Sequence, residues 1–146
     1  MSTPIAVITV TYSPGTYLES FLDSIPGATE KAAYVVLADN GSTDGVPEQQ
    51  ADKRENVEFF ATGGNLGYGT AINRAVQHLK GRKERGDIDG DFFVVSNPDV
   101  VFDPGSIDAM LECAQRWPGA ATIGPRIREA DGAAYPSART VPTIRN

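Results

Sequence analysis

The sequence predicts an α/β protein in which a mainly parallel sheet carries helices on both faces. Short apolar segments rich in β-branched and aromatic residues alternate along the chain with segments whose apolar residues recur at helical spacing. Strands that alternate with helices join in parallel, because each helix returns the chain to the same end of the sheet. The 146 residues contain no internal repeat or interdomain linker. We therefore expect residues 1–146 to form a single domain, with a loosely ordered tail at 136–146.

In the first half of the chain, proline and glycine mark where the predicted elements end. The first strand stops at Ser13-Pro14-Gly15, and the helix that follows stops at Pro26-Gly27. A short helix begins near Val46-Pro47, with proline in its first turn. The predicted elements, in order, are a strand Pro4–Thr11, a helix Leu18–Ile25, a strand Tyr34–Ala38, the short helix, and a strand Val57–Phe60.

The second half begins with a long helix and a buried strand. An apolar stripe from Ala71 to Leu79 predicts a helix, and the charged residues 81–91 predict a loop. A second apolar stripe from Ile107 to Trp117 predicts another helix, which Pro118-Gly119 ends. The predicted elements are the helix Tyr68–Lys80, a buried strand Phe92–Ser96, the helix Ile107–Trp117, a fifth strand Ala121–Ile127, a turn at Asp131-Gly132 and a short strand near Tyr135.

Composition excludes several classes of function. The net charge is −6 and the only dense basic stretch is residues 80–85, so we expect no nucleic-acid partner. No segment approaches the roughly 18 apolar residues of a membrane span, and the N-terminus lacks a signal pattern, which predicts a cytoplasmic protein. The single Cys113 excludes an internal disulfide framework and a cysteine-rich zinc site.

The acid that follows the Phe92–Ser96 strand is a candidate ligand for a hard cation. The strand closes with Asn97-Pro98-Asp99, which places Asp99 beyond its carboxyl end, where open α/β sheets bind their ligands. A carboxylate at such a position either holds a cation or caps the next helix. Asp103 followed by Pro104 is the better N-cap, which leaves Asp99 available as a ligand.

Other polar clusters follow the first two strands and precede the long helix. Thr11-Tyr12 and the run Asp39–Gly45 come at strand ends, and a parallel sheet gathers such ends at one edge. Taken alone, Asp39–Gly45 is equally well explained as a turn. The glycine-rich segment Gly63–Arg74 enters the long helix, whose N-terminal N–H groups can bind anions. Asn73 and Arg74 lie off the apolar stripe, so they reach either a ligand or solvent.

Several common signatures are missing. The first strand–helix turn lacks G-x-G-x-x-G, and no G-x-x-x-x-G-K-[ST] occurs, which disfavours a dinucleotide-binding dehydrogenase and a P-loop ATPase. His78 has no Ser or Cys partner in any motif, so we interpret it as a surface residue and expect no catalytic triad. Cys113 is interpreted as a packing residue.

Together these segments resemble the family 2 glycosyltransferases of the GT-A fold. The resemblance is carried by Val7–Tyr12, Asp39–Gly45, Asn65-Leu66-Gly67 with Asn73-Arg74, and Asn97-Pro98-Asp99, in the same order along nearly all of the chain. Within the family, the sequence is most similar to actinobacterial rhamnosyltransferases that extend a polyprenyl-diphosphate-linked N-acetylglucosamine. That narrower similarity is carried by Thr11–Gly15, Asn65–Arg74 and Tyr135–Arg139.

The resemblance implies roles for the candidate residues. Thr11 and Tyr12 would line the nucleotide pocket, and Asp39 would hydrogen-bond the base or ribose. The segment from Gly67 to Arg74 would lie along the nucleotide and its phosphates. Asn97-Pro98-Asp99 stands where the family has its Asp-x-Asp motif, with Asn97 in place of the first acid and Asp99 as the ligand of Mg²⁺ or Mn²⁺. The implied nucleotide-sugar-binding residues are Thr11, Tyr12, Asp39, Asn40, Gly67, Asn73, Arg74 and Asn97.

The resemblance also implies a reaction and its partners. The chain would be the donor-binding part of an inverting glycosyltransferase, truncated before the acceptor half, and the general base would lie beyond Asn146. The donor would be a dTDP- or UDP-sugar, with dTDP-rhamnose the expected one. The acceptor would be lipid-linked or a polysaccharide, bound through the missing segment, so that the isolated chain would be inactive. The full-length protein would be cytoplasmic and peripheral to the inner face of the membrane.

Two alternatives remain open from the sequence. The chain could be a non-catalytic module that binds a nucleotide-sugar or acts as a scaffold, and an exposed core face could make it a homo-oligomer. A nucleotidyltransferase is a weaker third reading, because Tyr12-Ser13-Pro14-Gly15 offers no lysine or arginine after the first strand. Metal-linked nucleotide binding distinguishes the donor site from the scaffold.

Overall fold

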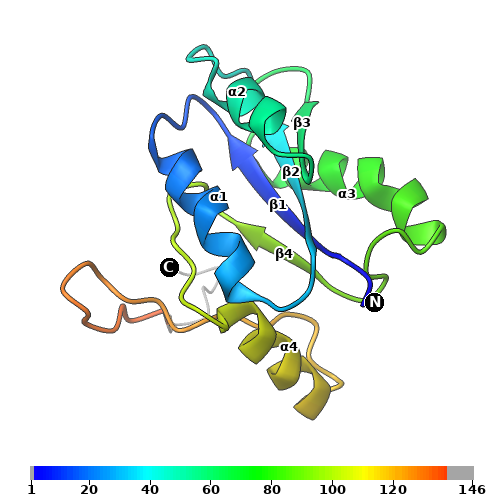
Figure 1. Ribbon diagram of the computed structural model, residues 1–146, viewed down its shortest axis with the longest axis vertical. Coiled ribbons are helices and arrows are strands. Elements are labelled where there is room, and N and C mark those ends of the chain that lie inside the picture. Colours follow the sequence, from blue (N-terminus) through cyan, green and yellow to red (C-terminus); the bar gives the residue numbers. More distant parts are fainter. Residues whose placement is uncertain (1, 138–146) are drawn as a thin grey trace, which may run out of the picture. The chain divides into compact units, whose positions relative to one another are not determined.

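The structure, a computed structural model that describes residues 2–137, contains a four-stranded parallel sheet (Figure 1). The chain divides into two compact units, residues 1–108 and 109–146. The sheet and the first three helices belong to the first unit. The elements are β1 (Ile5–Thr11), α1 (Tyr17–Ala28), β2 (Ala33–Asp39), α2 (Val46–Lys53), β3 (Val57–Ala61), α3 (Tyr68–Glu84), β4 (Phe93–Ser96) and α4 (Ser106–Arg116).

The predicted α/β class and the order of its first eight elements are confirmed. The strand order is β3-β2-β1-β4, and every pairing in the sheet is parallel. Within the described residues, no helix is both long enough and apolar enough to cross a membrane. The predicted tail at 136–146 lies outside the described residues except for Pro136 and Ser137.

Alternate residues of the strands form two cores, one on each face of the sheet. On one face, β1 and β2 pack Val7, Val35 and Leu37 against α1, and α2 extends this cluster (Figure 1). On the other face, α3 covers the side chains that point the opposite way. These include Ala6 and Ile8. Burial of each large apolar side chain contributes about 1.5–3 kcal/mol, so both layers stabilise the sheet.

The register brings the strand ends to a common edge. Thr11 is paired with Asp39, and Asp39 is paired with Ala61 at the end of β3. On the other side of β1, Thr9 is paired with Ser96, the last residue of β4. The polar segments that follow all four strands therefore begin at the carboxyl edge of the sheet, as the alternation of strands and helices predicted.

The prediction that β4 is a buried strand was wrong. The side chains of Phe93 and Val95 are 51% and 40% exposed. Both lie on the same face as Ala6 and Ile8, with which they are in register. The strand pairs only with β1, and the α3 core does not extend across it. Apolar composition predicted the strand correctly but could not show which face a helix would cover.

Three predicted boundaries moved. The first helix continues through Pro26 to Ala28, because a proline in the last turn removes only one backbone hydrogen bond. The long helix continues to Glu84, so the predicted loop 81–91 is shorter. The prediction that the next helix begins at Pro104 was wrong, since α4 begins at Ser106 and the Ser106 N–H donates to the Asp103 carbonyl in a turn (3.1 Å).

The predicted fifth strand Ala121–Ile127 does not form in the described part of the chain. Pro125 has no N–H to donate to a ladder, and a strand needs a neighbour with which to pair. The predicted turn at Asp131-Gly132 is present. It is closed by an isolated antiparallel bridge between Arg128 and Ala134. This single bridge stands in place of the short strand that was predicted near Tyr135.

Candidate functional site

The Asp39 carboxylate lies at the end of β2 and is fully hydrogen-bonded within the protein. One oxygen accepts the hydroxyl of Thr11 (2.6 Å) and the hydroxyl of Ser42. The other accepts the N–H groups of Gly41 (3.0 Å) and Ser42 (2.9 Å). A carboxylate has about four acceptor positions, so all of them are used. Asp39 therefore orders the loop that follows β2 and ties it to the end of β1.

Hydrogen bonding decides the charge of this carboxylate. Burial raises the pKa of Asp39, which is only 4% exposed, but the bonds from Ser42, Thr11 and Gly41 outweigh burial and bring the pKa below 3.8. The residue is thus anionic at neutral pH without a cationic partner. Any base or ribose that reaches Asp39 would have to share or displace one of these four bonds.

The loops after β1 and β2 are also bonded to each other. The Ser13 N–H donates to the Ser42 hydroxyl (2.8 Å), and the Thr43 N–H donates to the Ser13 hydroxyl (3.0 Å). The Asp44 carboxylate accepts the Gly15 N–H (3.0 Å). Ser13 is the one non-glycine residue with a positive φ, 48°, among the described residues. Such a backbone persists only where its surroundings hold it, and here the second loop does so.

A second network joins β2 to the loop before α3. The Asn40 amide donates to the Gly67 carbonyl (3.3 Å), and its oxygen lies 2.7 Å from the Thr62 hydroxyl. The Arg74 guanidinium donates to the Thr62 carbonyl. Asn40 and Thr62 are 3% and 2% exposed. The predicted residues Asn40, Gly67 and Arg74 are therefore brought together, through a threonine that the sequence analysis did not select.

Other predicted residues face solvent at the same edge. Tyr12 is 61% exposed, and Asn73, Asn97 and Asp99 are also exposed. The Asp99 carboxylate forms no hydrogen bond or ion pair with the residues that the structure describes. It is therefore available to an external ligand, unlike Asp39.

The described residues contain no group of three or more His, Cys, Asp or Glu side chains able to hold a metal ion by themselves. A cation at Asp99 would thus have one protein carboxylate and would take its other ligands from a bound molecule or water. Such a ligand set suits Mg²⁺ or Mn²⁺, which bind through few carboxylates together with substrate phosphates.

The first turn of α3 offers backbone donors. Gly67 precedes the helix with φ 80° and ψ 167°, and no side chain caps the helix. This backbone conformation is essentially restricted to glycine. The first N–H groups of a helix have no partner within it, and together with the helix dipole they attract anions.

His78 lies on α3 and contacts residues of β3. Its Nε2 lies 2.5 Å from a Glu58 carboxylate oxygen, and its ring stacks on Phe60 with centroids 4.3 Å apart. Tyr34 donates to the other Glu58 oxygen. Burial, followed by the Glu58 carboxylate, raises the pKa of Tyr34 to about 12. His78 is exposed, as interpreted from the sequence. Its part in this cluster, which attaches α3 to the sheet, was not predicted.

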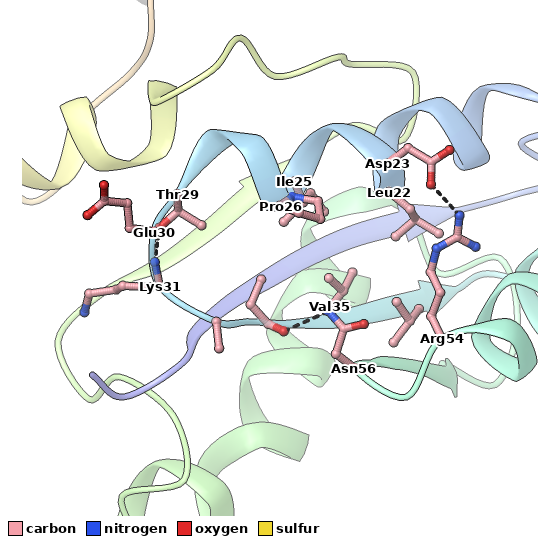
Figure 2. Close-up of a pocket in the computed structure, with 13 residues that line it drawn as sticks. Leu22, Asp23, Ile25, Pro26, Thr29, Glu30, Lys31, Val35, Arg54 and Asn56 are labelled. Carbon is pink, nitrogen blue, oxygen red and sulfur yellow. Dashed lines mark hydrogen bonds and ion pairs between the residues drawn. The ribbon is translucent and has the colours of Figure 1, made fainter. Parts of the chain in front are cut away.

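A cavity lies at the opposite edge of the sheet. It has a volume of about 570 Å³ and is lined by the end of α1 and the starts of β2 and β3 (Figure 2). Two of its polar side chains have partners within the protein: Arg54 with Asp23 at 2.7 Å and Asn56 with the Ala33 carbonyl at 3.0 Å. None of the predicted site residues lines this cavity, so the candidate site is the open carboxyl edge.

Comparison with known proteins identifies the family and the fold of this chain. The family model described as glycosyl transferase family 2 matches residues 6–145. Two curated relatives are N-acetylglucosaminyl-diphospho-decaprenol L-rhamnosyltransferases of Mycobacterium tuberculosis, from strains CDC 1551 / Oshkosh and ATCC 25618 / H37Rv. Each is 48% identical over 152 aligned residues, which cover 99% of this chain and 48% of the relative. The chain thus spans about half the length of these relatives.

Solved structures show the same fold. Residues 1–349 of S. aureus TarS have a TM-score of 0.59 at 18% identity, over 78% of this chain and 33% of that one. A second TarS crystal structure has a TM-score of 0.53 at 20% identity, over 78% and 20%. At these identities the likeness concerns the fold alone. The family match covers nearly the whole chain, and the chain belongs to glycosyl transferase family 2.

Proposed function

We propose that this chain binds the nucleotide-sugar donor of an inverting glycosyltransferase, with dTDP-rhamnose as the donor. The observation that carries the proposal is the convergence, at one sheet edge, of the polar segments that follow β1, β2 and β4 and of the loop that begins α3. Open α/β sheets bind ligands at this edge. The rhamnosyltransferase names of the two relatives support the choice of sugar.

The proposed roles of the residues follow from their exposure: exposed side chains contact the donor, and buried ones order the pocket. Tyr12 is exposed and offers an aromatic face to the base, whereas Thr11 and Asp39 are buried and order the pocket wall. Asn40 and Gly67 set the start of α3. Asn73 is exposed, and Arg74 uses one guanidinium nitrogen for the Thr62 carbonyl. The remaining N–H donors of Arg74 can contact a phosphate.

The site fits Mg²⁺ or Mn²⁺ with Asp99 as the protein ligand and Asn97 beside it. When bound, the ion would neutralise charge that develops on the departing nucleotide diphosphate. The fit rests on the exposed Asp99 carboxylate, which has no partner in the described residues, and on the α3 N-terminus, which would bind further phosphate oxygens. Asn97 brings one negative charge fewer than an aspartate would, so more of the coordination would come from the diphosphate.

We further propose that these 146 residues bind donor but transfer little sugar. An inverting transfer needs a base that takes a proton from the acceptor hydroxyl. Asp39 at the end of β2 and Asp44 in the loop that follows accept backbone N–H groups, and Asp99 is assigned to the ion. The acceptor, which we expect to be a lipid-linked N-acetylglucosaminyl diphosphate, would be bound by other parts of the full-length protein, peripheral to the cytoplasmic face of a membrane.

Calorimetry and a transfer assay test the proposal together. We expect dTDP-rhamnose and dTDP to bind in the presence of Mg²⁺, with dTDP binding more tightly than UDP, and expect negligible transfer to a synthetic polyprenyl-diphosphate N-acetylglucosamine. Absence of binding of any nucleotide would favour a scaffold. Robust transfer by the 146 residues would refute the claim that the base lies elsewhere. The homo-oligomer expected from an uncovered face stays a prediction, which sedimentation of the same sample tests.

A further inference from the structure

Thr62, the first residue after β3, is a buried polar residue placed between three segments of the carboxyl edge. Its N–H donates to the Asp39 carbonyl (2.9 Å), which extends the pairing of β3 with β2 by one residue. Its carbonyl accepts the Arg74 guanidinium from α3. With 2% exposure, the side chain has no access to solvent as an alternative partner.

The Thr62 hydroxyl lies within hydrogen-bonding distance of three acceptors. These are the Asp39 carbonyl at 2.9 Å, the Asn40 side-chain oxygen at 2.7 Å and the Gly64 carbonyl at 3.0 Å. One hydroxyl carries a single proton, so it alternates among acceptors that belong to two different segments. Since the Asn40 amide in turn donates to the Gly67 carbonyl, the contacts of Thr62 reach both ends of the loop before α3.

The loop itself has little intrinsic preference for its shape. Gly63, Gly64 and Gly67 have φ angles of 100°, 151° and 80°. Glycine reaches such angles readily but loses more backbone freedom on ordering than any other residue. A Cβ on Gly63 would lie 3.3 Å from the Arg74 guanidinium, so this glycine lets the arginine approach the Thr62 carbonyl. The conformation of residues 63–67 therefore depends on contacts from outside the loop.

We propose that Thr62 is a positioning residue for the donor site: its hydroxyl fixes residues 63–67 and thereby the N–H groups that open α3. The inference rests on the proposed function, because it assigns this loop to the donor diphosphate. Thr62 itself would touch no ligand and would act through Asn40 and Gly64.

The test compares Thr62→Val, which removes the hydroxyl at nearly constant shape, with Thr62→Ser, which keeps it. Thr9→Val is the matched control, because Thr9 is also fully buried but its hydroxyl has no partner among the described residues. Loss of one hydrogen bond predicts an increase of about three- to tenfold in the Kd of Mg²⁺–dTDP for Thr62→Val. We expect Thr62→Ser and Thr9→Val to remain within about twofold of wild type.

Hydrogen exchange of the ligand-free chain gives a second readout. The amides of residues 63–68 are expected to exchange faster in Thr62→Val but not in Thr62→Ser. Equal Kd values, or unchanged exchange at 63–68, would overturn the inference. If Thr62→Val does not fold, Thr62→Ala replaces it, and failure of both to fold would also overturn it, since the role would then be in folding. If wild type binds neither dTDP nor UDP, it is the proposed function that fails.

Discussion

Neutralising Asp39 is the perturbation whose size the structure determines best. In Asp39→Asn, one acceptor oxygen becomes an NH₂ group that faces the donors now bonded to the carboxylate. All four hydrogen bonds, from Thr11, Gly41 and Ser42, also lose the contribution of the negative charge. Hydrogen bonds to a charged group are worth about 1 kcal/mol more than neutral ones. Because both hydroxyls can rotate to accept instead, we expect a loss of about 2–4 kcal/mol in the free energy of unfolding.

The stability difference between wild type and Asp39→Asn should depend on pH. The pKa of Asp39 is lower in the folded chain than its ordinary value of 3.8. Its contribution to stability is therefore fully present above about pH 4 and is lost as the pH falls through the folded pKa. Below that pH the wild-type side chain is protonated, so wild type and Asp39→Asn should become equally stable.

Urea unfolding followed by far-ultraviolet circular dichroism, between pH 7 and pH 2.5, measures this difference. Asp52→Asn, which removes the same charge from the exposed face of α2, is the control and should match wild type within about 0.5 kcal/mol. A loss of stability for Asp39→Asn below about 0.5 kcal/mol at pH 7 would show that the four hydrogen bonds of the carboxylate contribute little. A stability difference that does not change with pH would show that the charge of Asp39 is irrelevant to stability.

Three further outcomes test other parts of the fold by the same denaturation assay. Thr9→Val should leave stability unchanged or raise it by about 1 kcal/mol, because the buried hydroxyl has no partner in the described residues; a clear loss would contradict this. Gly67→Ala should lower the free energy of unfolding by about 1–3 kcal/mol, because alanine is strained at the backbone angles of Gly67. Gly69→Ala, inside α3, should instead stabilise the chain, and equal effects of the two substitutions would argue against backbone strain at Gly67. Burial raises the pKa of Glu58, but hydrogen bonds from Tyr34 and His78 and the charges of His78 and Arg82 outweigh burial and lower the pKa overall. Glu58→Gln should therefore destabilise the chain at pH 7, and its difference from wild type should shrink as the pH falls through the folded pKa of Glu58; a difference that grows at acid pH would contradict this.

The topology of the sheet could be predicted from the sequence because it depends on local patterns. Apolar strands that alternate with amphipathic helices allow few arrangements, and a parallel sheet then fixes which loops meet. Thr11, Asp39 and Asn97 were placed at one edge in this way, and the register of β1 with its two neighbours confirms that the strands end together.

The direction of the polar side chains could not be predicted in the same way. Asp39 was expected to face a nucleotide, but its partners include Thr11, which is 28 residues away in the chain. Thr62 was not selected, because a threonine after a strand resembles any other strand residue until the loops fold around it. The nearest available signal was the pair of glycines that follows it, which indicates a loop with little shape of its own.

Two errors of prediction have a common cause, because each depends on a neighbouring element. The exposure of Phe93 depends on which helix covers that face of the sheet, and a strand at 121–127 would need a neighbour that accepts its hydrogen bonds. A pattern within one segment carries no information about that neighbour.

We propose that Asp99 and a divalent cation together bind a nucleotide diphosphate at the carboxyl edge. Calorimetric titration of dTDP, with Mg²⁺ or with a chelator, tests it in wild type, Asp99→Asn and the charge-matched Asp52→Asn. We predict that Mg²⁺ tightens binding by about tenfold or more, equivalent to about 1.4 kcal/mol, in wild type and Asp52→Asn, and that Asp99→Asn loses this gain while keeping its fold. Binding that ignores the cation, or a gain that survives in Asp99→Asn, would contradict the assignment.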